Sequence, residues 1–291
     1  MKEPMNLLRT GMIGLLLTGI GLALLGCSPQ KAPEGPGKIV FEMSQSEEVS
    51  DIEVVNPDGT GLKDVVKDGQ WNGTPALSPD GQRVAFTSER DGNAEIYLVN
   101  VDGSNLTRVT NNCASDVMPA WSPDGKRLAF ISDRAYKVPL SGGSVEVQAS
   151  LELYVMNLDG TGLERLTGNP EDRSFYPSWS PDGKKITYMN AADKGYLYVV
   201  DVPPGKGEPV NLTPKLAVSA WSPRWSPDNK YIVFMGDNNT KKEIYRMDPD
   251  GKNLEDLTKD WPTSCAEPTI SRTGNASPLP ARRVRMSTYM S

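Results

Sequence analysis

The stretch PAWSPDGKRLAF (residues 119–130) decides the fold, because nearly the same twelve residues occur four times. The other copies are PALSPDGQRVAF (75–86), PSWSPDGKKITY (177–188) and PRWSPDNKYIVF (223–234). Ser-Pro-Asp-Gly fits a type I turn, in which serine caps the first position, proline presets φ at the second and glycine takes the last. The residues after each turn alternate in polarity, which predicts a β-strand.

A second Asp-Gly turn recurs between the copies, as in NVDGSNL (100–106), and leads into a short strand such as LTRVT (106–110). Alternating segments such as EIYLVN (95–100) supply a further strand. A four-stranded antiparallel unit repeated about every 44 residues is typical of a propeller blade. The residues that we expect to pack between neighbouring blades are Trp121, Trp179 and Trp225, with Leu77 in the remaining copy.

These aromatic-Ser-Pro-Asp-Gly units resemble the WD40-like repeats of the TolB family of β-propellers. The resemblance implies an all-β propeller over residues 38–271, with five recognisable blades of four antiparallel strands and an incomplete last one. The first unit, which begins at KIVFEMS (38–44), lacks its innermost strand, and EPTIS (267–271) is an innermost strand without the rest. Either the two close a five-bladed ring, or a six-bladed TolB-like parent has lost its last blade.

The C-terminal segment 272–291 differs from the repeats in charge and in amino-acid sequence. No acidic residue follows Glu267, arginines accumulate, and SRTG stands where SPDG is expected. When the codons that could encode this segment are read in a shifted frame, they can encode a sequence that resembles a strand of the repeats. We interpret this segment as an atypical basic tail that a frameshift near residue 272 would explain.

The first 37 residues are typical of an exported lipoprotein. A charged start and a short apolar stretch indicate a signal peptide over residues 1–26, since about sixteen apolar residues are fewer than a membrane-spanning helix needs. Leu-Leu-Gly-Cys at 24–27 resembles a lipobox, which implies a lipidated Cys27, and the linker over 28–37 is rich in Pro and Gly. We therefore expect an extracytoplasmic protein that is anchored by lipid, at the periplasmic face of the outer membrane in a Gram-negative cell and otherwise at the cell surface; a signal anchor is the alternative.

Composition limits the chemistry that the chain can perform. The formal charge of −6 argues against a nucleic-acid partner, and the absence of histidine removes Ser-His-Asp catalysis and the common zinc sites. We predict that the protein is not an enzyme and has no catalytic residue, metal or cofactor, although a glycosidase that needs only two carboxylates, such as Asp116 and Asp172, stays open. A disulfide between Cys113 and Cys265 is a further alternative.

The candidate binding surface is the rim that carries the variable loops. In an antiparallel blade, the loop into the first strand and the loop between the second and third strands share this rim, which includes the insertion 135–150. Aromatic and charged side chains around a channel mouth suit a protein or peptide segment. The rim residues that we predict to bind it are Trp71, Asp116, Asp172, Arg173, Tyr176, Trp221 and Trp261. The plainer interpretation is that Trp71 and Trp261 pin loops onto blades.

Three functions follow from this interpretation. The first is a monomeric, non-catalytic propeller that binds an envelope protein or peptide at the channel mouth, as the resemblance to TolB implies. The second is a carbohydrate-binding surface lipoprotein, because aromatic rings also stack on sugars. The third is the carboxylate-dependent glycan-active enzyme.

Overall fold

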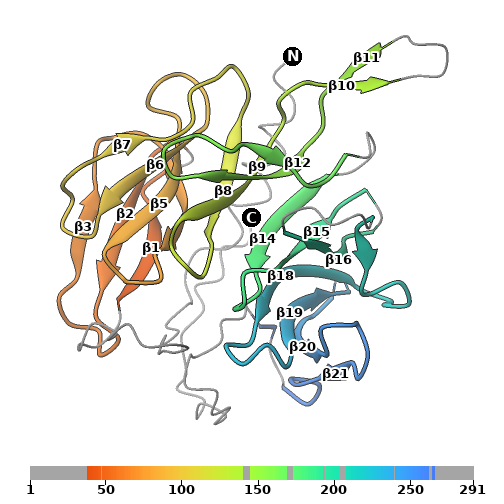
Figure 1. The fold of residues 1–291 in the computed structure, drawn as a ribbon. Coiled ribbons are helices and arrows are strands. Elements are labelled where there is room, and N and C mark those ends of the chain that lie inside the picture. Colours follow the sequence, from red (N-terminus) through yellow and green to blue (C-terminus); the bar gives the residue numbers. More distant parts are fainter. Residues whose placement is uncertain are drawn as a thin grey trace.

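The structure of the chain is a computed structural model, and it describes residues 38–46, 48–139, 145–168, 173–192, 194–202, 208–238, 240–261 and 264–265. Every regular element in these residues is a β-strand. Figure 1 shows the sheets set side by side around a central axis, from β1–β3 to β18–β21. The predicted signal peptide, Cys27, the linker, the EPTIS strand and the tail lie outside the described residues.

Five sheets form the blades. Blade 1 is β1 (Ile39–Ser44), β2 (Ser50–Val55) and β3 (Lys63–Val66); blade 2 is β4 (Asn72–Leu77), β5 (Arg83–Ser88), β6 (Glu95–Asn100) and β7 (Thr107–Arg108). Blade 3 is β8 (Asp116–Trp121), β9 (Arg127–Ser132), β12 (Glu152–Asn157) and β13 (Glu164–Arg165). Blade 4 is β14 (Ser174–Trp179), β15 (Lys185–Asn190), β16 (Tyr196–Asp201) and β17 (Val210–Asn211). Blade 5 is β18 (Ser219–Trp225), β19 (Ile232–Asp237), β20 (Lys242–Met247) and β21 (Glu255–Asp256).

The predicted all-β propeller is confirmed. Among the described residues, four blades have four antiparallel strands and blade 1 has three, without the innermost strand, as the sequence predicts. The insertion in blade 3 forms a hairpin of β10 (Tyr136–Pro139) and β11 (Val145–Gln148), which Figure 1 shows projecting from the body of the propeller. No helix within the described part of the chain is long and apolar enough to cross a membrane.

The hydrophobic core is divided into clusters that lie between blades rather than within them. Each cluster consists mainly of side chains from two neighbouring blades; for example, Leu98 of blade 2 and Tyr154 of blade 3 belong to one cluster. Equivalent clusters join blades 1 and 2, blades 3 and 4, and blades 4 and 5. Each blade therefore buries its apolar faces only by lying against its neighbours.

The repeated tryptophans hold neighbouring blades together, as the sequence predicts. Trp121 and Trp179 are almost fully buried, and each donates its indole N–H to a carbonyl of the preceding blade, at 2.9 Å from Ala76 O and 3.2 Å from Ala120 O. Trp225 donates instead to Thr187 Oγ1 at 3.0 Å. These side chains join apolar burial to a directed hydrogen bond between blades.

The Ser-Pro-Asp-Gly turns stack along one rim. In blade 3, Ser122 Oγ donates to Asp124 Oδ1 at 2.6 Å, and Lys126 N–H donates to the same oxygen at 3.1 Å. Gly125 has a φ of +68°, and a Cβ there would lie 3.8 Å from the ring of Pro79 in blade 2. The aspartates therefore shape the turns, and the turn of one blade rests on that of the blade before it.

The outward faces of blades 1 and 5 carry charges at positions that are apolar elsewhere. In blades 2–5 an aromatic pair faces the preceding blade, such as Phe130 and Tyr154 with ring centroids 5.9 Å apart. Blade 1 has Glu53 opposite Phe41 at this position. On the other face, Arg246 of blade 5 occupies the register position that Leu98 fills in blade 2.

We expect Trp179→Ala to lower the free energy of unfolding by about 3–5 kcal/mol, because it empties a space between blades 3 and 4 and leaves Ala120 O without its donor. Urea denaturation followed by circular dichroism measures the loss. The control is Trp261→Ala, whose side chain is 51% exposed and which should change stability by less than about 0.5 kcal/mol. Equal losses for the two variants would contradict the role of the interblade tryptophans.

The turn aspartates predict a dependence of stability on pH. Although burial raises the pKa of Asp124, the hydrogen bonds from Ser122 and Lys126 outweigh it and hold the pKa below its usual value. A carboxylate with a lowered folded-state pKa stabilises above the unfolded pKa of about 4, and the contribution is lost as the pH falls through the folded pKa. Asp124→Asn should therefore cost about 0.5–1 kcal/mol at pH 7, a small value because the side chain is exposed, and less at pH 3.

Urea denaturation at both pH values checks this prediction, with Asp260→Asn as an exposed control that should behave like wild type at both. A loss for Asp124→Asn that is the same at pH 3 and pH 7 would show that the negative charge does not stabilise the turn.

Candidate functional site

Backbone hydrogen bonds fix which loops share the rim opposite the Ser-Pro-Asp-Gly turns. Asp116 N–H, at the start of the first strand of blade 3, donates to Ala94 O, just before the third strand of blade 2, at 2.8 Å. Ser174 N–H likewise donates to Leu151 O at 2.7 Å. The loop into each first strand therefore lies beside the second-to-third-strand loop of the preceding blade. We call this edge of the propeller the first-strand rim.

The innermost strands are distorted next to this rim. Each of the first strands β4, β8, β14 and β18 shifts register at one residue that has a positive φ and precedes a proline. A non-glycine residue in this conformation is uncommon, and a bulge re-aims the side chains around it. The four residues are Thr74, Met118, Tyr176 and Ser222, with φ values of +50°, +56°, +53° and +49°.

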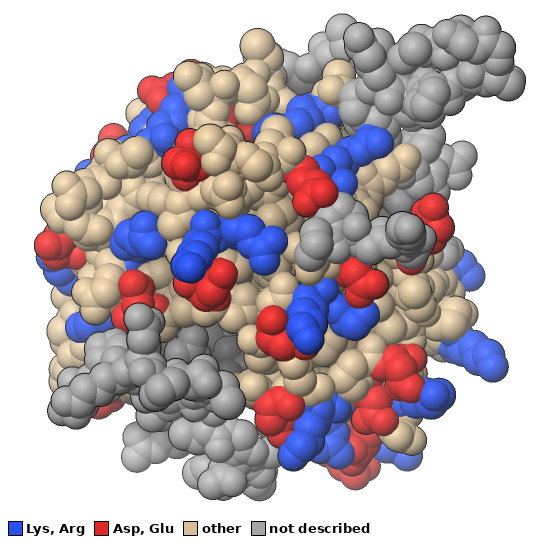
Figure 2. Space-filling model, in the orientation of Figure 1, with Lys and Arg blue, Asp and Glu red and all other residues tan. Residues whose placement is uncertain are grey.

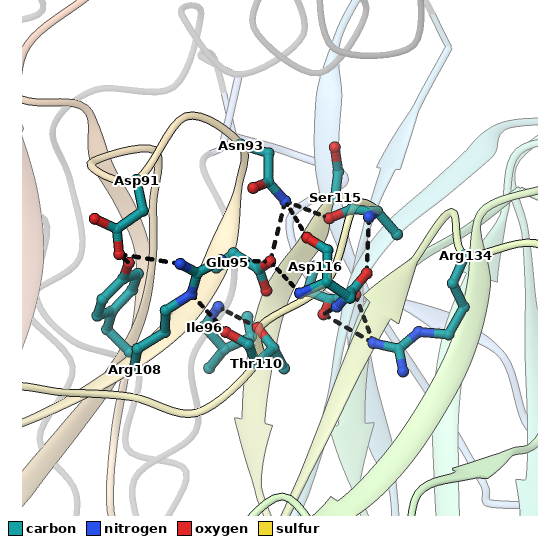
Figure 3. Close-up of polar contacts among 12 residues, drawn as sticks. Asp91, Asn93, Glu95, Ile96, Arg108, Thr110, Ser115, Asp116 and Arg134 are labelled. Carbon is teal, nitrogen blue, oxygen red and sulfur yellow. Dashed lines mark hydrogen bonds and ion pairs between the residues drawn. The ribbon is translucent and has the colours of Figure 1, made fainter.

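Asp116, a predicted ligand residue, is instead a buried structural group. It has no exposed surface, and both of its carboxylate oxygens lie 2.8 Å from one nitrogen of Arg134, while Asn112 Nδ2 donates to Oδ2 at 2.7 Å (Figure 3). Arg134 also stacks on Phe130 and Tyr154 of the same blade. Burial raises the pKa of Asp116, against the lowering effect of Arg134. The carboxylate thus anchors the start of β8, and both of its oxygens are engaged by neighbouring side chains.

A line of polar contacts continues from this anchor into blade 2 (Figure 3). Glu95, also fully buried, accepts from Arg108 Nη2 at 2.9 Å and from Asn112 N–H at 2.8 Å. Asn93 Nδ2 donates to Glu95 at 3.1 Å and to Ala114 O at 2.6 Å. The loop over 111–115 is therefore held by side chains of the blade before it.

Two predicted aromatic residues are brought together between blades 4 and 5. The ring centroids of Tyr176 and Trp221 lie 6.1 Å apart at an interplanar angle of 65°, and the centroids of Phe175 and Tyr176 lie 6.4 Å apart. Both predicted residues are half-buried. The indole nitrogen of Trp221 is buried and has no hydrogen-bond partner among the described residues. We call Phe175, Tyr176 and Trp221 the aromatic cluster.

Trp71 lines a pocket of about 380 Å³ at the edge between blades 1 and 2. A Cβ on Gly73 would lie 2.5 Å from the Trp71 ring and 2.9 Å from Glu42 Oε2, so the absence of a side chain at Gly73 lets the ring and the carboxylate approach. Burial raises the pKa of Glu42. The residues that line the pocket are Glu48, Val49, Gly69, Gln70, Trp71 and Glu89.

The remaining predicted residues do not gather with these. Arg173 is exposed, and its backbone forms an isolated parallel β-bridge with that of Leu151. Trp261 is exposed beyond β21, and Asp172 lies outside the described residues. Cys113 is exposed and Cys265 is partly buried, and both are free thiols rather than a disulfide. The described residues include no group of three acidic or cysteine side chains that could hold a metal ion.

Sequence reasoning missed the carboxylates around Trp71 and the aromatic partner Phe175. The signal for Phe175 was its place beside Tyr176 before a repeated proline. Glu48 and Glu89 gave no signal in the sequence, because they belong to different blades and only the fold brings them to the same pocket. On the face drawn in Figure 2, basic and acidic side chains are interspersed, so no large area of one sign marks a binding surface there.

The comparisons with known proteins agree with this architecture. The TolB beta propeller domain family matches residues 24–149 and 138–277. TolB from Acinetobacter baumannii has a similar structure, with a TM-score of 0.61 and 21% identity over 76% of this chain and 52% of that one. A putative TolB from Agrobacterium tumefaciens has a TM-score of 0.58 and 23% identity, over 75% of this chain and 79% of that one. The chain thus spans about half the length of the Acinetobacter protein. No curated protein matches the sequence significantly.

The prediction that the protein is not an enzyme requires correction. A puromycin-hydrolyzing peptidase from Mycobacterium tuberculosis also shares the fold, with a TM-score of 0.54 and 17% identity over 78% of this chain and 36% of that one. Because a propeller of similar fold occurs within an enzyme, the propeller fold of this chain does not exclude catalysis. The absence of histidine led us to predict that the chain has no enzymatic activity, and this prediction was wrong. A missing residue type does not decide whether a protein is an enzyme.

We expect Arg134→Leu to destabilise the protein by about 3 kcal/mol at pH 8, because it leaves Asp116 buried without its cation. The pKa of Asp116, already raised by burial, should rise further, so the loss should shrink at pH 5 as the carboxyl gains a proton in the folded state. Denaturation with urea at the two pH values tests this.

The double variant Arg134→Leu/Asp116→Asn serves as the control, and it should recover part of the loss at pH 8. If the single variant lost the same free energy at both pH values, Asp116 would not be the group that Arg134 neutralises.

Proposed function

The chain belongs to the TolB beta propeller domain family, and from that premise we propose that it binds a protein or peptide segment of the cell envelope at its first-strand rim. The proposal includes an extracytoplasmic location, with the chain held at the membrane by lipid on Cys27. The similarity in fold to two TolB structures supports an envelope role, and the lipobox-like LLGC sequence supports the anchor.

The observation that carries the proposal is the aromatic cluster. Tyr176 and Trp221 are contributed by the distorted first strands of two neighbouring blades, and each retains exposed surface. Tyrosine and tryptophan are the residues most often found at the energetic centre of protein interfaces. The indole nitrogen of Trp221 is itself buried, so the surface that Trp221 offers to a partner is its ring rather than its N–H group.

Site-specific photo-cross-linking in intact cells tests which rim contacts a partner. A photoreactive phenylalanine analogue at position 221 should capture a discrete envelope protein. The same analogue at Lys184, directly after the Ser-Pro-Asp-Gly turn of blade 4 on the opposite rim, should not. Cross-links from position 184 alone would place the partner on the wrong rim and overturn the proposal.

A quantitative test uses the captured protein and Trp221→Ala, which removes the aromatic ring. The affinity of this variant should fall by tenfold or more, and so should that of Tyr176→Ala. Lys184→Ala is the matched control and should bind like wild type. Unchanged affinity in both aromatic variants, or retention on glycans instead of capture of a protein, would contradict the proposal.

A further inference from the structure

The outward face of blade 1, the side turned away from blade 2, carries more acidic than basic side chains. Asp51 and Glu53 alternate along β2 on this face and lie opposite Met43 and Phe41 of β1, while the residues between them belong to the cluster shared with blade 2. Asp64 of β3 is the register partner of Glu53. Among the described residues, no hydrophobic cluster joins this face to blade 5.

Two carboxylates of this face are buried without enough hydrogen-bond donors. Asp51 is 1% exposed and Glu53 is 9% exposed, yet Asp51 Oδ1 and Glu53 Oε2 have no partner in the described part of the chain. The cation beside them is Lys67, which lies 3.7 Å from Asp51 and 3.3 Å from Asp64. Burial raises the pKa of Glu53, and so does the charge of Asp64. Because a buried carboxylate oxygen without a donor is costly, these groups point to a cationic donor outside the described residues.

The cations on the outward face of blade 5 have acidic partners of their own. Arg246 is paired with Glu255, and Lys242 lies 3.9 Å from Asp237. The basic tail over residues 272–291 is different, because it contains no acidic residue to balance its arginines. These arginines are Arg272, Arg282, Arg283 and Arg285.

The chain leaves blade 5 on the side where a following blade would lie. Cys265 N–H donates to Lys242 O at 2.8 Å, which is the contact that Asp116 N–H makes with Ala94 O where the chain enters blade 3. In the arrangement of sheets around the axis, blade 1 is the next one (Figure 1). When extended, the chain from Cys265 to residue 282 reaches on the order of 50 Å, about the diameter of a compact domain of this size. The tail is therefore long enough to reach blade 1.

We infer that the basic tail docks on the outward face of blade 1 and sets an arginine from residues 282–285 against Asp51 and Glu53. A guanidinium carries five N–H donors in a planar fork, which is sufficient to serve the oxygens of two neighbouring carboxylates. Phe41 and Met43 are half-buried on the same face and offer an apolar surface for the methylene chain and the guanidinium plane.

Blade 3 contains the same combination of contacts within one sheet. Arg134 donates to the buried carboxylate of Asp116 and stacks on Phe130. On blade 1, the arginine would come from the tail instead of the blade itself. The tail would then cover the face that a preceding blade covers elsewhere in the array. This inference does not depend on the proposed function, because it concerns a contact within the chain.

The test places a photoreactive phenylalanine analogue at Val284 in the full chain. Trypsin cleaves after Lys38 and Lys63, so β1 and β2 lie together in the peptide 39–63. We expect the analogue to capture this peptide, and added salt should lower the yield by screening the charges. A mixture of ¹⁵N-labelled and unlabelled chains separates capture within one chain from capture between two copies, because only the second gives mixed pairs.

Charge-neutral variants test the chemistry of the contact. Asp51→Asn/Glu53→Gln should lower the yield at least fivefold. Arg282→Gln/Arg283→Gln/Arg285→Gln, which changes no residue of the blades, should do the same. The control Glu164→Gln/Glu208→Gln removes two negative charges from exposed positions elsewhere and should leave the yield unchanged. Circular dichroism checks that each variant keeps its strands.

Three results would overturn the inference. The first is capture of a peptide other than 39–63, and the second is capture between two copies of the chain. The third is a yield that is the same in the control and in the variants of Asp51, Glu53 and the tail.

Discussion

The need of every blade to be covered on both faces governs this structure. A single four-stranded sheet carries apolar residues on each side, and the four clusters of the core all lie between sheets. At about 25 cal/mol for each Å² of apolar surface removed from water, this stacking supplies the main driving force. The indole hydrogen bonds of Trp121 and Trp179 then fix how neighbouring blades are aligned. These interblade contacts therefore determine how the loops are arranged along both rims.

The candidate site lies where the inner strands depart from regular geometry. A residue such as Tyr176, with a positive φ before a proline, costs on the order of 1–3 kcal/mol, which the surrounding packing must offset. The same bulge recurs in four blades, so it belongs to the architecture and does not by itself mark a function. What differs from blade to blade is the side chain that it displays. Tyr176 meets Trp221, whereas Met118 is buried and Thr74 contacts Thr87.

The fold could be predicted from the sequence because its determinants are local. A Ser-Pro-Asp-Gly turn closes within four residues, and the repetition of this turn after a tryptophan predicts a propeller blade. The candidate site could be predicted only in part. Asp116 and Trp71 both looked like rim residues, but Arg134, which buries Asp116, is placed beside it by the pairing of β8 with β9. Glu48 and Glu89 come from two blades and line one pocket. Such distant contacts, and the question of activity, do not follow from local patterns.

The charged faces of the two outer blades make the array directional. A copy of the repeat placed between two internal blades would meet an aromatic pair on one side and a leucine or valine on the other, as its neighbours do. A copy joined beyond blade 5 would set its aromatic pair against the guanidinium of Arg246, and one joined before blade 1 would press an aliphatic side chain onto Glu53. Arg246 could cover such a pair as Arg134 covers Phe130 and Tyr154, whereas burying Glu53 beneath an aliphatic side chain would cost free energy. An added repeat is therefore disfavoured beside blade 1 and tolerated beside blade 5.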